Sequence, residues 1–283
     1  MSSPDPNGLD DHVRARVDRE RDAHTDGDVL GESVELKNRF AHIWSYPGVT
    51  RLRAALDAAL RDVEGARVLD YGCGRGERSL SALRLGAEVD GIDISEVYIA
   101  EAAAAARAAG HSEARFRFAV GDAHALPYAD GAFDLVVGEG IVHHLDIATA
   151  LAEVHRVLRP GGRALFLEPL LDNPLLKVFR RLTPSARTDD ERPLSASDLR
   201  RIAGSGRWRV ESTYSGLVAA PVAVATSLLV PSRPDNALLR TADRAEQALA
   251  RRGWLDAWHQ YVLLNLVRAD GPAAGASGDG APA

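Results

Sequence analysis

Apolar residues in the middle of the chain form short runs that alternate with stretches of helical periodicity. The runs fall at residues 67–71, 88–92, 115–120, 133–137 and 163–167. Continuous apolar runs of this length, such as 133–137, are typical of buried parallel strands. Ser95 can cap one intervening helix, which runs through the alanine-rich residues 102–109, and alanine is the best helix former. Alternation of this kind predicts a parallel α/β sheet with right-handed crossovers.

The flanking regions predict further elements of the same domain. Leu52, Leu56 and Leu60 recur every four residues, as on one face of a helix. A later helix is expected to begin at Ser195 or Ser197, where a hydroxyl can accept an early backbone N–H. The remaining expectations are a sixth strand at 208–214, a helical insertion at 216–254 and a seventh strand at 259–268.

Composition favours one large globular domain with short tails. The chain has 283 residues, of which 46% are hydrophobic and 26% charged. We predict a disordered or loosely helical tail at 1–30, a domain at 31–270 and a disordered tail at 271–283. Within the domain, residues 31–64 supply N-terminal helices and 170–256 supply cap elements. The formal net charge of −6 argues against nucleic-acid binding driven by overall charge.

Targeting signals and membrane spans are not visible in the sequence. The first residues carry no apolar core of a signal peptide. No run of about 18 apolar residues occurs that would cross a bilayer. The single cysteine, Cys73, rules out an intramolecular disulfide. We expect a cytoplasmic protein, with weak peripheral membrane contact left open for the apolar segment 216–230.

The most informative stretch is 67–78, which reads RVLDYGCGRGER. A short apolar strand ends near Asp70, and Gly72, Gly74 and Gly76 follow in alternation before a helix. Glycine permits a sharp turn and lets a ligand approach the backbone closely. A strand-to-helix turn of this kind forms a nucleotide-shaped pocket at the carboxyl end of a parallel sheet.

One ligand that such a pocket could bind is a dinucleotide such as NAD. The dinucleotide fingerprint is G-x-G-x-x-G with an acidic residue about 20 positions later. Asp93 supplies the acid, but Gly76 comes one position too early and Glu77 stands where the third glycine belongs. An NAD site is therefore a weaker match, and it stays open as an alternative.

Downstream motifs resemble those of the class I S-adenosylmethionine-dependent methyltransferases, in particular the broad small-molecule "type 11" group. Five motifs occur in the family's order: 68–76 (VLDYGCGRG), 91–95 (GIDIS), 121–127 (GDAHALP), 133–137 (FDLVV) followed by 143–145 (HHL), and 158–162 (LRPGG). The resemblance covers residues 65–167. It implies a Rossmann-like, seven-stranded, mostly parallel sheet with helices on both faces.

The resemblance also implies S-adenosylmethionine as cofactor and a set of residues that hold it. Asp70 would help hold the methionine end, Asp93 would accept hydrogen bonds from both ribose hydroxyls, and Asp122 would accept one from the adenine amino group. Glu139 would line the pocket near the sulfonium. The full implied set is Asp70, Gly72, Cys73, Gly74, Gly76, Asp93, Ile94, Asp122, Ala123 and Glu139.

Three residues are candidates for catalysis. His143 or His144 would serve as a general base, since histidine titrates near neutral pH; the alternative is that one caps or packs the following helix and the other lines the pocket. Glu168, at the end of a strand, would contact substrate or make a structural hydrogen bond. We expect no metal site, because His155 lies on a helix whose period does not bring it to His143, His144 and Asp146.

We therefore predict an S-adenosylmethionine-dependent methyltransferase. Its acceptor would be an O, N or C atom of a small, fairly apolar metabolite, because the cap is apolar and the chain acidic. An NAD-linked oxidoreductase and a noncatalytic S-adenosylmethionine-binding protein are the alternatives.

Overall fold

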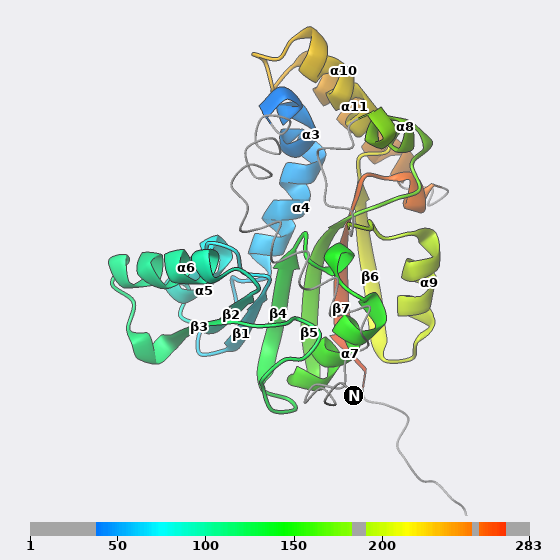
Figure 1. Ribbon diagram of the computed structural model, residues 1–283. Helices are drawn as coiled ribbons and strands as arrows, with labels where there is room; N and C mark the ends of the chain where they lie inside the picture. Colours follow the sequence, from blue (N-terminus) through cyan, green and yellow to red (C-terminus); the bar gives the residue numbers. More distant parts are fainter. Residues whose placement is uncertain (1–37, 183–190, 251–254, 270–283) are drawn as a thin grey trace, which may run out of the picture.

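A single seven-stranded sheet forms the centre of the molecule (Figure 1). The computed structural model describes residues 38–182, 191–250 and 255–269, so both predicted tails lie outside the described residues. The strand order is β3-β2-β1-β4-β5-β7-β6. β7 pairs antiparallel with β5 and β6, whereas the other pairs in this sheet are parallel. The predicted fold class is confirmed.

All seven strands lie where the apolar pattern predicts them. They are β1 (Arg67–Tyr71), β2 (Glu88–Asp93), β3 (Phe116–Val120), β4 (Phe133–Glu139), β5 (Leu158–Pro169), β6 (Trp208–Ser215) and β7 (Tyr261–Arg268). β5 begins earlier than expected. Leu158 already pairs with Phe133, the register then shifts across the Pro160–Gly162 segment, and regular pairing resumes at Arg163.

Helices fill the connections and continue beyond the sheet. They are α3 (Ala41–Ser45), α4 (Pro47–Ala58), α5 (Glu77–Arg84), α6 (Glu96–Ala108), α7 (Ile147–Val157), α8 (Pro174–Leu182), α9 (Ala196–Gly204), α10 (Ala219–Leu229) and α11 (Ala237–Ala250). Ser95 caps α6 by accepting from the Tyr98 N–H. Ser195 caps α9 in a reciprocal capping box with Asp198, which settles the choice between Ser195 and Ser197.

Two apolar layers cover the two faces of the sheet. Leu52, Leu56 and Leu60 are buried in the layer that α4, α5 and α6 share with one face. Residues of α7 and α9, such as Val154 and Ile202, belong to the layer on the opposite face. Side chains of successive strand residues point to opposite faces, so the helices enclose the strands and leave the carboxyl edge for a binding site.

α3, α8, α10 and α11 form a helical cap at one end of the sheet (Figure 1). α10 packs against the other three, and Phe40 meets Phe179 of α8 edge-to-face with ring centroids 4.9 Å apart. The predicted helical insertion at 216–254 contains α10 and α11. Among the described helices, none combines the length and apolar character needed to cross a bilayer.

Glu246 of α11 fastens this cap to the sheet. Its side chain is buried, and its two oxygens accept hydrogen bonds from the Ser215 hydroxyl and from the backbone N–H groups of Gly216, Val218 and Ala219, at 2.6–3.1 Å. The N–H groups at the start of a helix have no partner within the helix, so this carboxylate satisfies donors that α10 leaves open.

We expect Glu246→Ala to lower the free energy of unfolding by about 3 kcal/mol or more, because several buried donors lose their acceptor together. Arg240→Ala is the matched control on the same helix: its ion pair with Asp235 is exposed, and such pairs contribute about 0–1 kcal/mol. Urea denaturation measures both. A Glu246→Ala protein as stable as the control would contradict the role of Glu246.

Candidate active site

The glycine turn between β1 and α5 lies at the carboxyl edge of the sheet. Gly72, Gly74 and Gly76 all have positive φ, at +72°, +50° and +80°. A Cβ on Gly76 would come within 2.9 Å of the Ala102 Cβ on α6, whereas one on Gly74 would meet no atom within 4 Å. Gly76 therefore allows close helix packing, and Gly74 leaves the backbone open to a ligand.

A cavity of about 220 Å³ opens beside this turn, between the carboxyl ends of β1 to β4. Seven of the ten predicted cofactor-binding residues line it: Gly72, Gly74, Asp93, Ile94, Asp122, Ala123 and Glu139. His144 lines it as well. The structure thus gathers into one cavity residues that are spread over four strand ends.

Asp93 links the glycine turn to the end of β2. Its Oδ2 accepts the Gly74 N–H at 2.8 Å and its Oδ1 accepts the Ser95 N–H at 2.9 Å. These two bonds fix the carboxylate at the cavity wall. A carboxylate has further acceptor sites on both oxygens, so this side chain suits a vicinal diol.

Asp122, just after β3, is positioned by a histidine that the sequence did not single out. Asp122 Oδ1 accepts from the His124 backbone N–H at 2.8 Å and from the His124 ring at 2.7 Å. The opposite ring nitrogen of His124 accepts the Asp146 N–H at 2.9 Å. Because Nε2 accepts, the ring proton lies on Nδ1, and His124 holds Asp122 as a neutral donor.

Glu139, at the end of β4, is held by two arginines from different helices. Its Oε1 accepts from Arg53 Nε of α4 at 2.7 Å, and its Oε2 pairs with Arg78 of α5. Arg78 also lies 3.7 Å from Asp57. Neither arginine was predicted from the sequence, because each reaches Glu139 from a distant part of the chain.

Three predicted cofactor residues do not line the cavity: Asp70, Cys73 and Gly76. Asp70 is buried and accepts a hydrogen bond from the Ser79 hydroxyl at 2.6 Å. Burial raises the pKa of Asp70, while the bond from Ser79 and the nearby charge of Arg78 oppose that rise. Asp70 supports the turn from the α5 side, and its contact with the methionine end stays a prediction.

Cys73 is buried, and burial raises the pKa of its thiol well above the usual range. The protonated thiol is a poor nucleophile. We therefore expect Cys73 to resist iodoacetamide at pH 8 in the folded protein and to react after unfolding in urea, as measured by mass spectrometry. Rapid alkylation of the folded protein would contradict this packing role.

The candidate catalytic residues come together where β4 and β5 end. His143 and His144 lie in a short 3₁₀ turn, η2 (Val142–His144). Glu168 is fully buried; its Oε1 accepts the backbone N–H groups of Ile141 and Val142 at 3.1 and 2.9 Å, and its Oε2 lies 2.7 Å from His143 Nδ1. Glu168 thus makes structural hydrogen bonds to this turn and to His143, and its contact with substrate stays a prediction.

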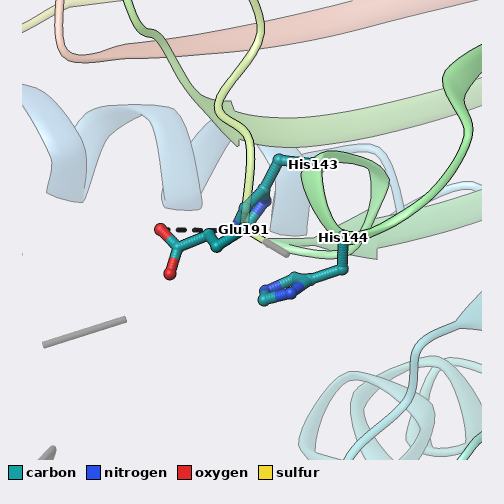
Figure 2. A group of neighbouring side chains, drawn as sticks. All are labelled: His143, His144 and Glu191. Atoms are coloured by element: carbon teal, nitrogen blue, oxygen red, sulfur yellow. Dashed lines mark ion pairs between the residues drawn. The ribbon is translucent and has the colours of Figure 1, made fainter. Parts of the chain in front are cut away.

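Glu191 adds a second carboxylate beside the two histidines (Figure 2). The His143 and His144 rings lie 4.1 Å apart between centroids, and Glu191 Oε1 is 3.9 Å from His143 Nε2. His155 packs against Trp208 instead, and the Asp146 side chain caps α7. The expectation that His155 stays apart is confirmed, but the sequence did not predict that Glu191 would join the pair.

Comparison with known proteins identifies a methyltransferase domain in this chain. Residues 69–166 match the family model described as "Methyltransferase domain". The O-methyltransferase cnsE of Penicillium expansum is 32% identical over 56% of this chain and 58% of its own length. The demethylmenaquinone methyltransferase of Thermus thermophilus is 41% identical over 41% of this chain and 52% of its own. The chain thus spans little more than half the length of these relatives.

A solved structure shows the same fold. Geranyl diphosphate C-methyltransferase from Streptomyces coelicolor A3(2) superposes with a TM-score of 0.55, at 20% identity over 78% of this chain and 82% of that one. Residues 69–166 contain four of the five motifs described above in full and the first motif from Leu69 onward. Residues 69–166 therefore match a methyltransferase domain, and the chain shares its fold with a solved methyltransferase.

Proposed function

We propose that this protein transfers a methyl group from S-adenosylmethionine to a small-molecule acceptor. The observation that carries the proposal is the cavity in which two strand-end carboxylates, Asp93 and Asp122, lie beside the open backbone of Gly74. One carboxylate suits a ribose diol and the other an amino-purine edge, in the order that the extended cofactor requires. These two acceptor carboxylates and the open backbone of Gly74 therefore fit S-adenosylmethionine.

Each part of the site has a role in this proposal. When bound, S-adenosylmethionine supplies a methyl group already activated by its sulfonium. Asp93 accepts from the ribose hydroxyls and Asp122, held by His124, accepts from the adenine amino group. Glu139, fixed by Arg53 and Arg78, lines the methionine side. The protein's main contribution is to align the acceptor with the methyl–sulfur bond and to exclude water.

The acceptor end of the site holds His143, His144 and Glu168. We assign to them the handling of the proton that the acceptor's nucleophilic atom loses. The apolar cap formed by α3, α8, α10 and α11 lies at the same end of the sheet (Figure 1), which favours a fairly apolar acceptor. The name of one relative, a demethylmenaquinone methyltransferase, is consistent with a small-molecule acceptor.

Incubation with methyl-labelled S-adenosylmethionine and a metabolite extract, followed by mass spectrometry, tests the proposal. The expected result is a labelled product that forms in proportion to S-adenosylhomocysteine. The Asp93→Ala protein serves as the control for background methylation. Binding of the cofactor without transfer to any acceptor would support the noncatalytic alternative instead.

A further inference from the structure

We propose that His143, His144 and Glu191 bind a divalent transition-metal ion at the acceptor side of the cavity. One ligand atom from each residue lies within 4.8 Å of the other two. Ligand atoms of one ion lie about 3–3.5 Å apart when each bond is about 2.1 Å. Side-chain shifts of about 1 Å therefore close the set around an ion.

The hydrogen bond at the other ring nitrogen of His143, Nδ1, supports the metal site independently. Glu168 Oε2 lies 2.7 Å from His143 Nδ1, and Glu168 is itself held by backbone N–H groups of the same turn. A histidine that ligates a metal almost always donates its other ring N–H to a carboxylate, carbonyl or water. This bond places the proton on Nδ1 and presents the lone pair of Nε2 to Glu191 and His144.

The position of Glu191 is fixed by the chain next to it. The Arg192 N–H donates to the His143 carbonyl at 3.0 Å, and the Arg192 guanidinium pairs with Asp198 at the start of α9. Glu191 itself is partly buried, with its side chain 18% exposed. Figure 2 shows its carboxylate beside the two imidazoles, although it comes from a distant part of the sequence.

The chemistry of the ligands narrows the choice of metal. Two imidazoles and one carboxylate suit Zn²⁺, Fe²⁺ or Co²⁺ better than Mg²⁺, which prefers oxygen ligands. Three protein ligands also leave coordination positions open, as in catalytic rather than structural sites. Two flanking carboxylates, Glu168 and Glu191, favour a cation at this point.

Since His144 lines the cavity, the open positions of the ion face the acceptor. The role that follows rests on the proposed function. An acceptor hydroxyl bound to the ion loses its proton to water at a lower pKa. The resulting oxygen attacks the methyl carbon, a C–O bond forms, the C–S bond breaks, and neutral S-adenosylhomocysteine leaves. The acceptor class is therefore a hydroxylated molecule, such as a phenol or enol, with an oxygen that can coordinate the metal.

Titration of the metal-stripped full-length protein with Co²⁺ tests the site, read by the visible absorbance of bound Co²⁺ and by competition with Zn²⁺. We expect one ion per chain. Glu191→Gln and His144→Ala should each weaken binding by about tenfold or more, in line with the loss of one ligand. His155→Gln, on α7 and outside the cluster, should leave it unchanged. Circular dichroism verifies that each variant is folded.

Two outcomes would overturn the metal site: no stoichiometric Co²⁺ binding, or binding that Glu191→Gln and His144→Ala leave unchanged. Methyl transfer that persists in excess chelator but is lost in His143→Asn would assign His143 as a direct base instead. In that case the proposed methyltransferase function would stand. Failure of the parent protein to bind S-adenosylhomocysteine would count against the methyltransferase function but would leave the conclusion from Co²⁺ binding unchanged.

Discussion

Replacing Asp93 by alanine is expected to weaken S-adenosylhomocysteine binding by about 100-fold or more. The variant would lose the two hydrogen bonds that the Asp93 carboxylate would accept from the ribose. Hydrogen bonds to a charged group contribute about 1.5–3 kcal/mol each. A loss of about 2.7 kcal/mol corresponds to about 100-fold in Kd. The Asp93 carboxylate also anchors the Gly74 and Ser95 N–H groups, so its removal loosens the turn as well. Isothermal titration calorimetry measures the change.

Asp90→Ala is the matched control for this experiment. Asp90 lies on the same strand, but its partner is Arg67 at 3.5 Å, away from the cavity. The affinity of the Asp90→Ala protein for S-adenosylhomocysteine should stay within about twofold of that of the parent protein, which is a change in binding free energy of ~0.4 kcal/mol. Asp93→Asn, which keeps one acceptor oxygen, should fall between the two. If Asp93→Ala binds as tightly as Asp90→Ala, Asp93 is not the ribose acceptor.

Glu168→Gln is expected to lower kcat by about 10²–10⁴-fold while the affinity for S-adenosylhomocysteine changes little. The amide can accept the Ile141 and Val142 N–H groups with its oxygen, and its NH₂ then faces His143 Nδ1. The imidazole must shift its proton to Nε2 to accept that bond. The nitrogen that faces the acceptor side would then carry a proton and could neither accept one nor ligate a metal.

Glu153→Gln provides the control, because Glu153 also accepts a backbone N–H and lies outside the cluster. Steady-state kinetics together with calorimetry separate the two effects. We expect a fall in kcat for Glu168→Gln alone. Unchanged kcat in a folded Glu168→Gln protein would show that the tautomer of His143 has no part in the reaction.

Local sequence patterns predicted the fold, and the resemblance to methyltransferases indicated which strand-end acids to expect in one cavity. Parallel strands place their carboxyl ends at one edge, so the acids at the ends of the second and third strands could be brought together from the sequence alone. The turn at Gly74 is likewise a property of a few neighbouring residues. Asp93 and Asp122 accordingly lie in the cavity as predicted.

Asp70 does not line the cavity, and the position of its side chain follows from the geometry of β1. Side chains alternate across a strand, and Val68 packs in the layer beneath α5, whereas Leu69 and Tyr71 pack on the opposite face. Asp70 shares the face of Val68, so it meets Ser79 of α5. Applying the alternation to β1 would have indicated this from the sequence.

The missed residues reach the site from distant segments. Arg53 joins Glu139 across 86 positions and Arg78 joins it across 61. Glu191 reaches His143 from the segment before α9. Such contacts depend on how helices pack on the sheet, which periodicity does not determine. The contacts of Glu139 and His143 are of this kind, so only the structure could reveal them.

The most direct test of the central claim is a calorimetric titration of the full-length protein with S-adenosylhomocysteine and, separately, with NADH. The account predicts one S-adenosylhomocysteine per chain, bound with micromolar or tighter affinity, about −8 kcal/mol or more negative, and no measurable heat from NADH. Tight binding of NADH without binding of S-adenosylhomocysteine would contradict it and would support the oxidoreductase alternative.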